Sequence, residues 1–155
     1  MAELKAAQVM ALRKKTGLPM MECKEALTEC DGDEAGAIEW LTKKHKGKME
    51  ARSDRETGEG RVGQFISADG KSGGIIELRC ETAPVAKNEM FIDLANKIAQ
   101  VVAEGGEAAP DAEGVKGQVE AQFTEVYGKL RETMNIGICR KVTGDALAGY
   151  VHFDG

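Results

Sequence analysis

The residue types that most often carry out chemistry are few in this chain and lie far apart. Neither of the two histidines, His45 and His152, belongs to a serine or cysteine motif that would tie it to a nucleophile. The four cysteines, at positions 23, 30, 80 and 139, lack the Cys-x-x-Cys pairing of metal and redox sites. We therefore expect no enzyme and no metal site. The cysteines are expected to be free, small hydrophobic side chains in a reducing cytosol.

Two glycine-rich stretches, residues 58–63 and 70–74, raise the question of nucleotide binding. Neither contains the Gly-x-x-x-x-Gly-Lys-Ser/Thr or the Gly-x-Gly-x-x-Gly pattern, so both are interpreted as turns and no cofactor is expected. Asp31, Asp33 and Glu34 crowd a predicted helix start without the ligand spacing of a calcium loop. Helix capping is the favoured interpretation of these acidic residues.

The segment from Arg79 to Glu89 is the most informative stretch for function. Apolar and charged side chains alternate up to Cys80, which predicts a half-buried strand, and an apolar stripe of helical spacing follows from Phe91 to Val102. Between the two patterns, Pro84 fixes its own φ and biases Ala83 toward extended geometry. We therefore predict a stiff loop that presents its side chains outward.

This loop resembles the signature loop of the elongation factor Ts family, the nucleotide-exchange factors of elongation factor Tu. The matching residues are Thr82, Val85, Ala86, Lys87 and Asn88. Between them, Ala83 and Pro84 replace the Asp and Phe to which the exchange activity of the family is usually attributed. The resemblance implies that residues 82–88 approach the magnesium and phosphate end of the partner's nucleotide site.

Residues 1–48 are predicted to form three short helices. Gly17 and Pro19 are typical of the end of the first helix, and Asp33 is a good N-cap for the third. Helices this short are not stable alone, so we expect them to bury their apolar stripes against one another.

The three-helix unit resembles a ubiquitin-associated (UBA-like) module and, more closely, the N-terminal domain of the elongation factor Ts family. The matching stretches are residues 12–17, 20–27 and 32–41. The resemblance implies that Arg13, Met20 and Met21 face elongation factor Tu, and a paired Met-Met suits docking against a partner helix. The alternative for one of the two methionines is a place in the core of the bundle.

The remainder of the chain is predicted to be a charged linker over residues 49–60 and an α+β core over residues 61–155. Strand patterns flank a hairpin turn at residues 69–73, two amphipathic helices follow, and the second carries an apolar stripe from Val115 to Leu130. Two further strands are predicted at 134–142 and 147–153. The fold class is therefore α+β, a three-helix UBA-like bundle followed by antiparallel strands packed with helices.

The last predicted strand stops at a turn signal with no partner beyond it. The resemblance covers only the first part of the family's core, so the chain is expected to be shortened at its C-terminus. An unpaired strand invites self-association through the open C-terminal edge.

Composition excludes several classes of function. The formal net charge of −5 argues against binding of a phosphate backbone. The lysines between positions 43 and 48 are followed at once by acidic residues, so an exposed linker is favoured over a nucleic-acid patch. No run approaches the roughly 20 apolar residues of a membrane span, and the first residues lack an apolar signal core, so the chain is expected in the cytoplasm.

Three hypotheses for function remain. In the first, the chain binds GDP-bound and nucleotide-free elongation factor Tu and promotes GDP release, as the resemblance implies. In the second, it is a Tu-binding module with weak or no exchange activity. In the third, the three-helix unit binds another helix or a ubiquitin-like partner; the match over residues 82–88 argues against it, because a generic scaffold would not need that loop.

Overall fold

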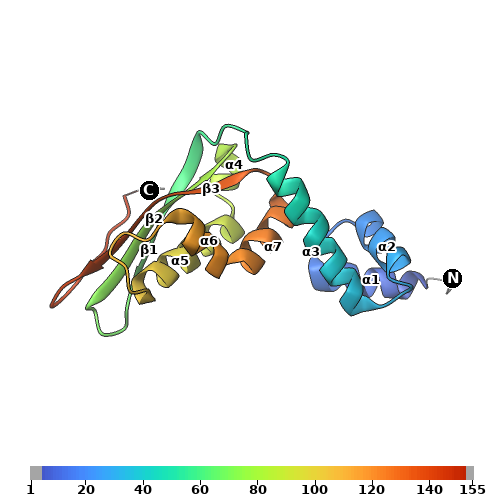
Figure 1. The fold of residues 1–155 in the computed structure, drawn as a ribbon, viewed down its shortest axis with the longest axis horizontal. Coiled ribbons are helices and arrows are strands. Elements are labelled where there is room, and N and C mark those ends of the chain that lie inside the picture. Colours follow the sequence, from blue (N-terminus) through green and yellow to red (C-terminus); the bar gives the residue numbers. More distant parts are fainter. Residues whose placement is uncertain (1–4, 153–155) are drawn as a thin grey trace.

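The computed structural model of the chain describes residues 5–152 and has a bundle of helices at one end and a long sheet at the other (Figure 1). Its elements in chain order are α1 (Ala6–Thr16), α2 (Met20–Glu29), α3 (Glu34–Glu50), β1 (Glu59–Ile66), β2 (Ser72–Cys80), α4 (Ala83–Ala86), α5 (Glu89–Glu104), α6 (Ala112–Gln118), α7 (Glu120–Leu130) and β3 (Met134–Thr143). This content confirms the predicted α+β class. In the described range, no helix combines the length and the apolar character that a membrane crossing requires.

In the bundle α1–α3, the end of α1 and the start of α3 lie where the sequence predicts. Gly17 takes a left-handed conformation with φ of 69°, and its N–H donates to the carbonyl of Arg13 at the end of α1. The Asp33 carboxylate accepts from the N–H of Gly36 at 2.8 Å and caps α3. The side chains that form the apolar core of the bundle are Val9, Leu12, Leu18, Cys23, Ala26, Leu27, Ala37 and Leu41.

Helix α3 continues past the predicted boundary at residue 48 and ends at Glu50. Residues 43–50, predicted to be the frayed end of the helix and the start of an exposed linker, are regular helix instead. His45 within this stretch is only 4% exposed, and Met49 joins the apolar core beneath the sheet. The physical reason is α7, which packs alongside the C-terminal half of α3 and covers it (Figure 1). One helix is therefore shared by the bundle and the core.

The three strands form an antiparallel sheet in the order β1-β2-β3, and α5 covers one of its faces (Figure 1). Ile76, Leu78 and Cys80 of β2 are buried against the apolar stripe of α5 that runs from Phe91 to Val102. Both the alternation in the strand and the helical stripe are confirmed.

The predicted helix with the stripe from Val115 to Leu130 is broken in two. Val119 has φ of −117° and ψ of 17° and separates α6 from α7, while its side chain stays buried. Gly114 and Gly117 lower the helix propensity of α6, and Asp111 caps it by accepting from the N–H groups of residues 113 and 114. The predicted apolar stripe is confirmed, because its residues from Val115 to Val126 are buried in the core.

The strand predicted at residues 147–153 is wrong for residues 147–152, and residue 153 lies outside the described part. The Leu147 N–H donates to the carbonyl of Gly70 at 2.7 Å, so the chain folds over the β1–β2 turn, and Gly149 then lies against the side chains of Gln64 and Ile66. A strand needs a ladder of main-chain hydrogen bonds to a neighbouring strand, and residues 147–152 join neither edge of the sheet. The C-terminal edge expected to promote self-association is therefore not formed in the described residues.

Candidate functional site

The segment predicted to be an outward loop contains a single helical turn, α4. Thr82, not Ala83, is the extended residue, with φ of −136° and ψ of 149°, and Ala83 begins the helix. Pro84 is tolerated here because the N–H groups of a first helical turn have no partner within the helix. The predicted loop is therefore a helical turn and not an extended segment.

The side chains of residues 82–88 divide into an outward set and an inward set. Thr82, Pro84 and Lys87 are exposed, and Ala83 is half-buried. Ala86 is buried in the core and is not available as a contact side chain, and Val85 packs against the same core. Asn88 accepts from the N–H of Met90 at 3.0 Å and caps α5. The inward residues hold the segment in place for the outward ones.

The start of α4 is held by two carboxylates. Glu132 accepts from the Thr82 N–H at 3.0 Å and from the Thr82 hydroxyl at 2.6 Å. The neighbouring Glu81 accepts from the Thr133 N–H at 2.7 Å and pairs with Arg55 at 3.0 Å. The hydrogen bond from the Thr133 N–H and the contact with Arg55 lower the pKa of Glu81 and keep it ionised. These contacts attach α4 to the chain that leaves α7.

The second predicted surface lies on the helical bundle. Arg13 is exposed on α1, and Met20 and Met21 in the first turn of α2 are 45% and 72% exposed. The alternative that one methionine belongs to the core is therefore wrong. Two large, adaptable apolar side chains next to one another on a surface are suited to contact with another protein.

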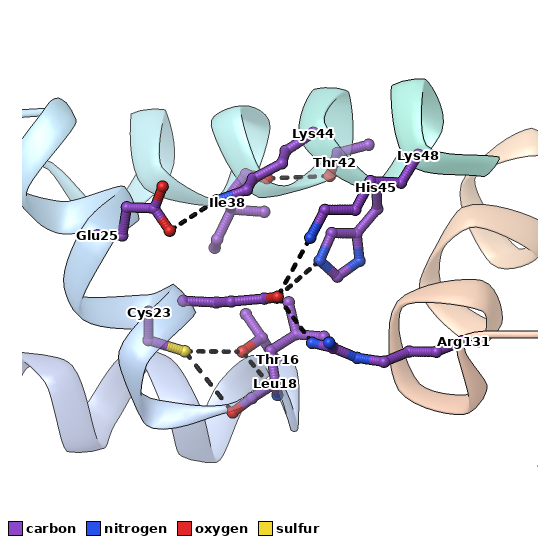
Figure 2. A network of polar contacts seen from close by, with 11 residues as sticks. Thr16, Leu18, Cys23, Glu25, Ile38, Thr42, Lys44, His45, Lys48 and Arg131 are labelled. Carbon is purple, nitrogen blue, oxygen red and sulfur yellow. Dashed lines mark hydrogen bonds and ion pairs between the residues drawn. The ribbon is translucent and has the colours of Figure 1, made fainter. Parts of the chain in front are cut away.

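Directly after the two methionines, Glu22 turns inward and forms a charged cluster that joins the bundle to the core. Figure 2 shows His45, Lys48 and Arg131 converging on one carboxylate, which is that of Glu22. The distances are 2.9 Å from His45 Nε2, 2.8 Å from Arg131 Nη2 and 3.5 Å from Lys48 Nζ. The Glu22 side chain is 14% exposed. Burial by itself would raise the pKa of Glu22, but hydrogen bonds from His45 and Arg131 and the charges of Arg131 and Lys48 outweigh it and lower the pKa to about 2.

Sequence reasoning missed this cluster. The partners of Glu22 lie 23, 26 and 109 positions away along the chain, so no local spacing relates them. The local sequence shows only that Glu22 directly follows two methionines, and this position does not indicate which residues the carboxylate contacts.

Three of the four cysteine side chains are buried. The four cysteines are free, as predicted; Cys23, Cys80 and Cys139 are buried and Cys30 is half-buried. Burial raises the pKa of Cys80 to about 11 and also raises the pKa of Cys139. Within residues 5–152, no group of three or more histidine, cysteine or acidic side chains is placed to hold a metal ion. The arrangement is suited to contact with a partner through two surfaces.

Several of the proteins to which this chain is similar carry the same name. No family model matches it. It is 42% identical to elongation factor Ts of Oleidesulfovibrio alaskensis, over 97% of this chain and 77% of that protein. It is 47% identical to elongation factor Ts of Bordetella avium, over 98% of this chain and 54% of the relative, and 45% identical to that of Azoarcus sp., over 98% and 53%. The chain therefore spans about three quarters of the first relative and about half of the other two.

Proposed function

The chain belongs to the elongation factor Ts family, whose members serve translation elongation, and on that premise we propose that it binds elongation factor Tu and promotes the release of GDP. The observation that best supports this proposal is the exposure of Met20 and Met21 together with the rigid attachment of α4. One partner could use both surfaces.

The residues proposed to contact elongation factor Tu are the exposed members of the predicted set and Ala83, the half-buried neighbour of Pro84. On the bundle they are Arg13, Met20 and Met21, and around α4 they are Thr82, Ala83, Pro84 and Lys87. The remaining three, Val85, Ala86 and Asn88, act through the position of α4 and not by touching the partner.

Exchange of this kind requires no chemistry from the chain. A protein that binds the nucleotide-free partner more tightly than the GDP-bound partner weakens GDP binding by the same factor, because the two binding equilibria are linked. The contribution of α4 would be a contact available only when the phosphate and magnesium end of the nucleotide site is open.

A second candidate function is binding of elongation factor Tu with weak or no exchange. Ala83 and Pro84 favour it, because they provide neither the carboxylate nor the aromatic ring found at these positions in the family's signature loop. Pro84 is nevertheless exposed in a stiff helical turn, where it can fill part of an apolar slot at a low ordering cost.

The rate of fluorescent GDP release from elongation factor Tu, with and without this chain in magnesium-containing buffer, distinguishes the two functions. We expect an acceleration of at least about tenfold, which corresponds to about 1.4 kcal/mol of barrier. No acceleration in samples where a complex is demonstrated would contradict exchange and support the binding module. Absence of any complex would contradict both.

Replacing Met20 and Met21 together with alanine is expected to weaken the complex with elongation factor Tu by about 2 kcal/mol, or about thirtyfold in Kd, because exposed anchor side chains carry much of the energy of an interface. Titration calorimetry measures the change. Ile138→Ala is the matched control, since Ile138 is also a large exposed apolar residue, at 59%, but lies on the sheet. Equal Kd values for the double variant and the control would remove the methionines from the contact surface.

A further inference from the structure

The two proposed contact surfaces lie on separate parts of the chain, and one short turn reaches both. The first surface includes Met20 and Met21 on α2, and the second is α4 with its flanking residues. The turn consists of residues 131–133, between the end of α7 and the start of β3.

Arg131 connects the turn to the first surface. Its Nη2 donates to Glu22 Oε1 at 2.8 Å, and Glu22 follows Met21 directly in the first turn of α2. Its main-chain carbonyl accepts from Nη1 of Arg52 at 3.1 Å. The Glu22 side chain is only 14% exposed and also contacts His45 and Lys48, so this ion pair is part of a network and not an isolated pair, while the Arg131 side chain itself is 46% exposed.

The next two residues connect the turn to the second surface. Both oxygens of the Glu132 carboxylate accept hydrogen bonds from Thr82, one from its N–H and one from its hydroxyl. Thr133 donates its N–H to Glu81 and its hydroxyl to the carbonyl of Arg52, at 2.7 Å and 3.0 Å. Three consecutive residues thus hold the start of α2 and the start of α4 at once.

The backbone at Arg131 supports a specific use for this side chain. Its φ of 59° and ψ of 23° are left-handed, a conformation in which glycine is the usual residue at a helix end and a side chain is disfavoured. Arginine is less favourable than glycine in this backbone conformation, but its guanidinium group forms an ion pair with the Glu22 carboxylate that glycine could not form. A non-glycine residue that is held in a left-handed conformation indicates a role for its side chain.

We infer that the turn of residues 131–133 is a positioning element that fixes the spacing between the methionine surface on α2 and the α4 surface, so that one partner engages both. The inference rests on the proposed function. When two contacts are rigidly spaced, the second forms at a high effective concentration after the first, and this advantage is lost when the spacing varies. Arg131 and Glu132 are positioning residues that need not touch the partner themselves.

The spacing between α2 and the core that carries α4 can be measured without any partner. Spin labels are placed on Glu29→Cys in α2 and Asp93→Cys in α5, both exposed, in a chain that carries Cys30→Ser, because the other three cysteines are buried. Pulsed electron resonance should give one narrow distance distribution for this chain and for the same chain with Arg131→Lys. Arg131→Met, which keeps the length and the backbone strain but loses the charge, should broaden it. A distribution left narrow by Arg131→Met would overturn the inference.

Affinity for elongation factor Tu provides the second readout. We expect Arg131→Met to weaken the complex at least about tenfold and Arg131→Lys to leave it within about twofold, whereas Arg140→Met on β3 controls for loss of one exposed arginine. Glu132→Ala keeps the Glu22 pair, so it should weaken the complex while the label distance stays narrow. If Arg131→Met broadened the distance yet bound as tightly as the unchanged chain, the coupling of the two surfaces would be refuted. Failure of the unchanged chain to bind would refute the proposed function itself.

Discussion

Replacing Gly74 with alanine is expected to destabilise the chain by at least about 3 kcal/mol, a large part of the stability of a typical domain. A Cβ at Gly74 would lie 2.0 Å from the carbonyl oxygen of Ala99 and 2.8 Å from the main-chain nitrogen of Ala103. These are backbone atoms of α5, so no side-chain rotation can relieve the overlap. Close by, the Ser72 hydroxyl donates to the carbonyl of Ala103 at 2.6 Å and holds the helix end against the strand.

The free energy of unfolding in urea, followed by far-ultraviolet circular dichroism, measures the effect at Gly74. Gly106→Ala is the matched control: a Cβ there meets nothing within 4 Å, so its effect should stay within about 0.5 kcal/mol. Similar unfolding free energies for the two variants would show that α5 does not lie directly on the backbone of β2.

The contribution of Glu22 to stability is expected to disappear in acid. Its pKa is about 2 in the folded chain and about 4.5 when unfolded. A carboxylate whose pKa is depressed by folding stabilises the fold above its unfolded pKa, and this stabilisation is lost as the pH falls through the folded pKa. Between pH 5 and pH 2 the loss amounts to about 3 kcal/mol, of which about 2 kcal/mol has occurred by pH 3.

The variant Glu22→Gln isolates this loss from general acid unfolding. Glutamine keeps the size of the side chain and does not titrate, and His45, Lys48 and Arg131 remain in both proteins. The free energies of unfolding in urea should therefore differ most at pH 5, with wild type the more stable, and converge as the pH falls toward 3. A difference that stays constant over this range would mean that the cluster does not depress the pKa of Glu22.

Local patterns predicted most of the individual elements. The alternation that ends at Cys80, the stripe from Phe91 to Val102 and the caps at Gly17 and Asp33 are all confirmed. Each depends on residues at most about a dozen positions apart, which is the range over which helix and strand periodicity operates. Met21 lies off the apolar stripe of α2, but Met20, three positions before Cys23, has the spacing of that stripe and is exposed nevertheless, so the pattern alone did not place it.

The errors arose where a distant segment decides the outcome. His45 is buried because α7 covers the end of α3, and the described C-terminal segment is not a strand because it folds over the β1–β2 turn and does not join an edge of the sheet. Ala86 has the sequence environment of a loop but faces the core, since α4 is a helical turn whose inner side rests on that core. In each case the local sequence pattern was compatible with both the predicted structure and the observed one.

By itself, the sequence determined the α+β class, the positions of most helices and strands and the family, and it supplied the candidates for contact with a partner, because these depend on composition, periodicity and short motifs. Only the tertiary structure decided which of those residues face outward and how the two surfaces are joined. The physical reason lies in the contacts of the Arg131–Thr133 turn, which reach residues between 50 and 109 positions away in the chain. Ion pairs and hydrogen bonds at such separations leave no periodic signal, and folding alone brings their partners together.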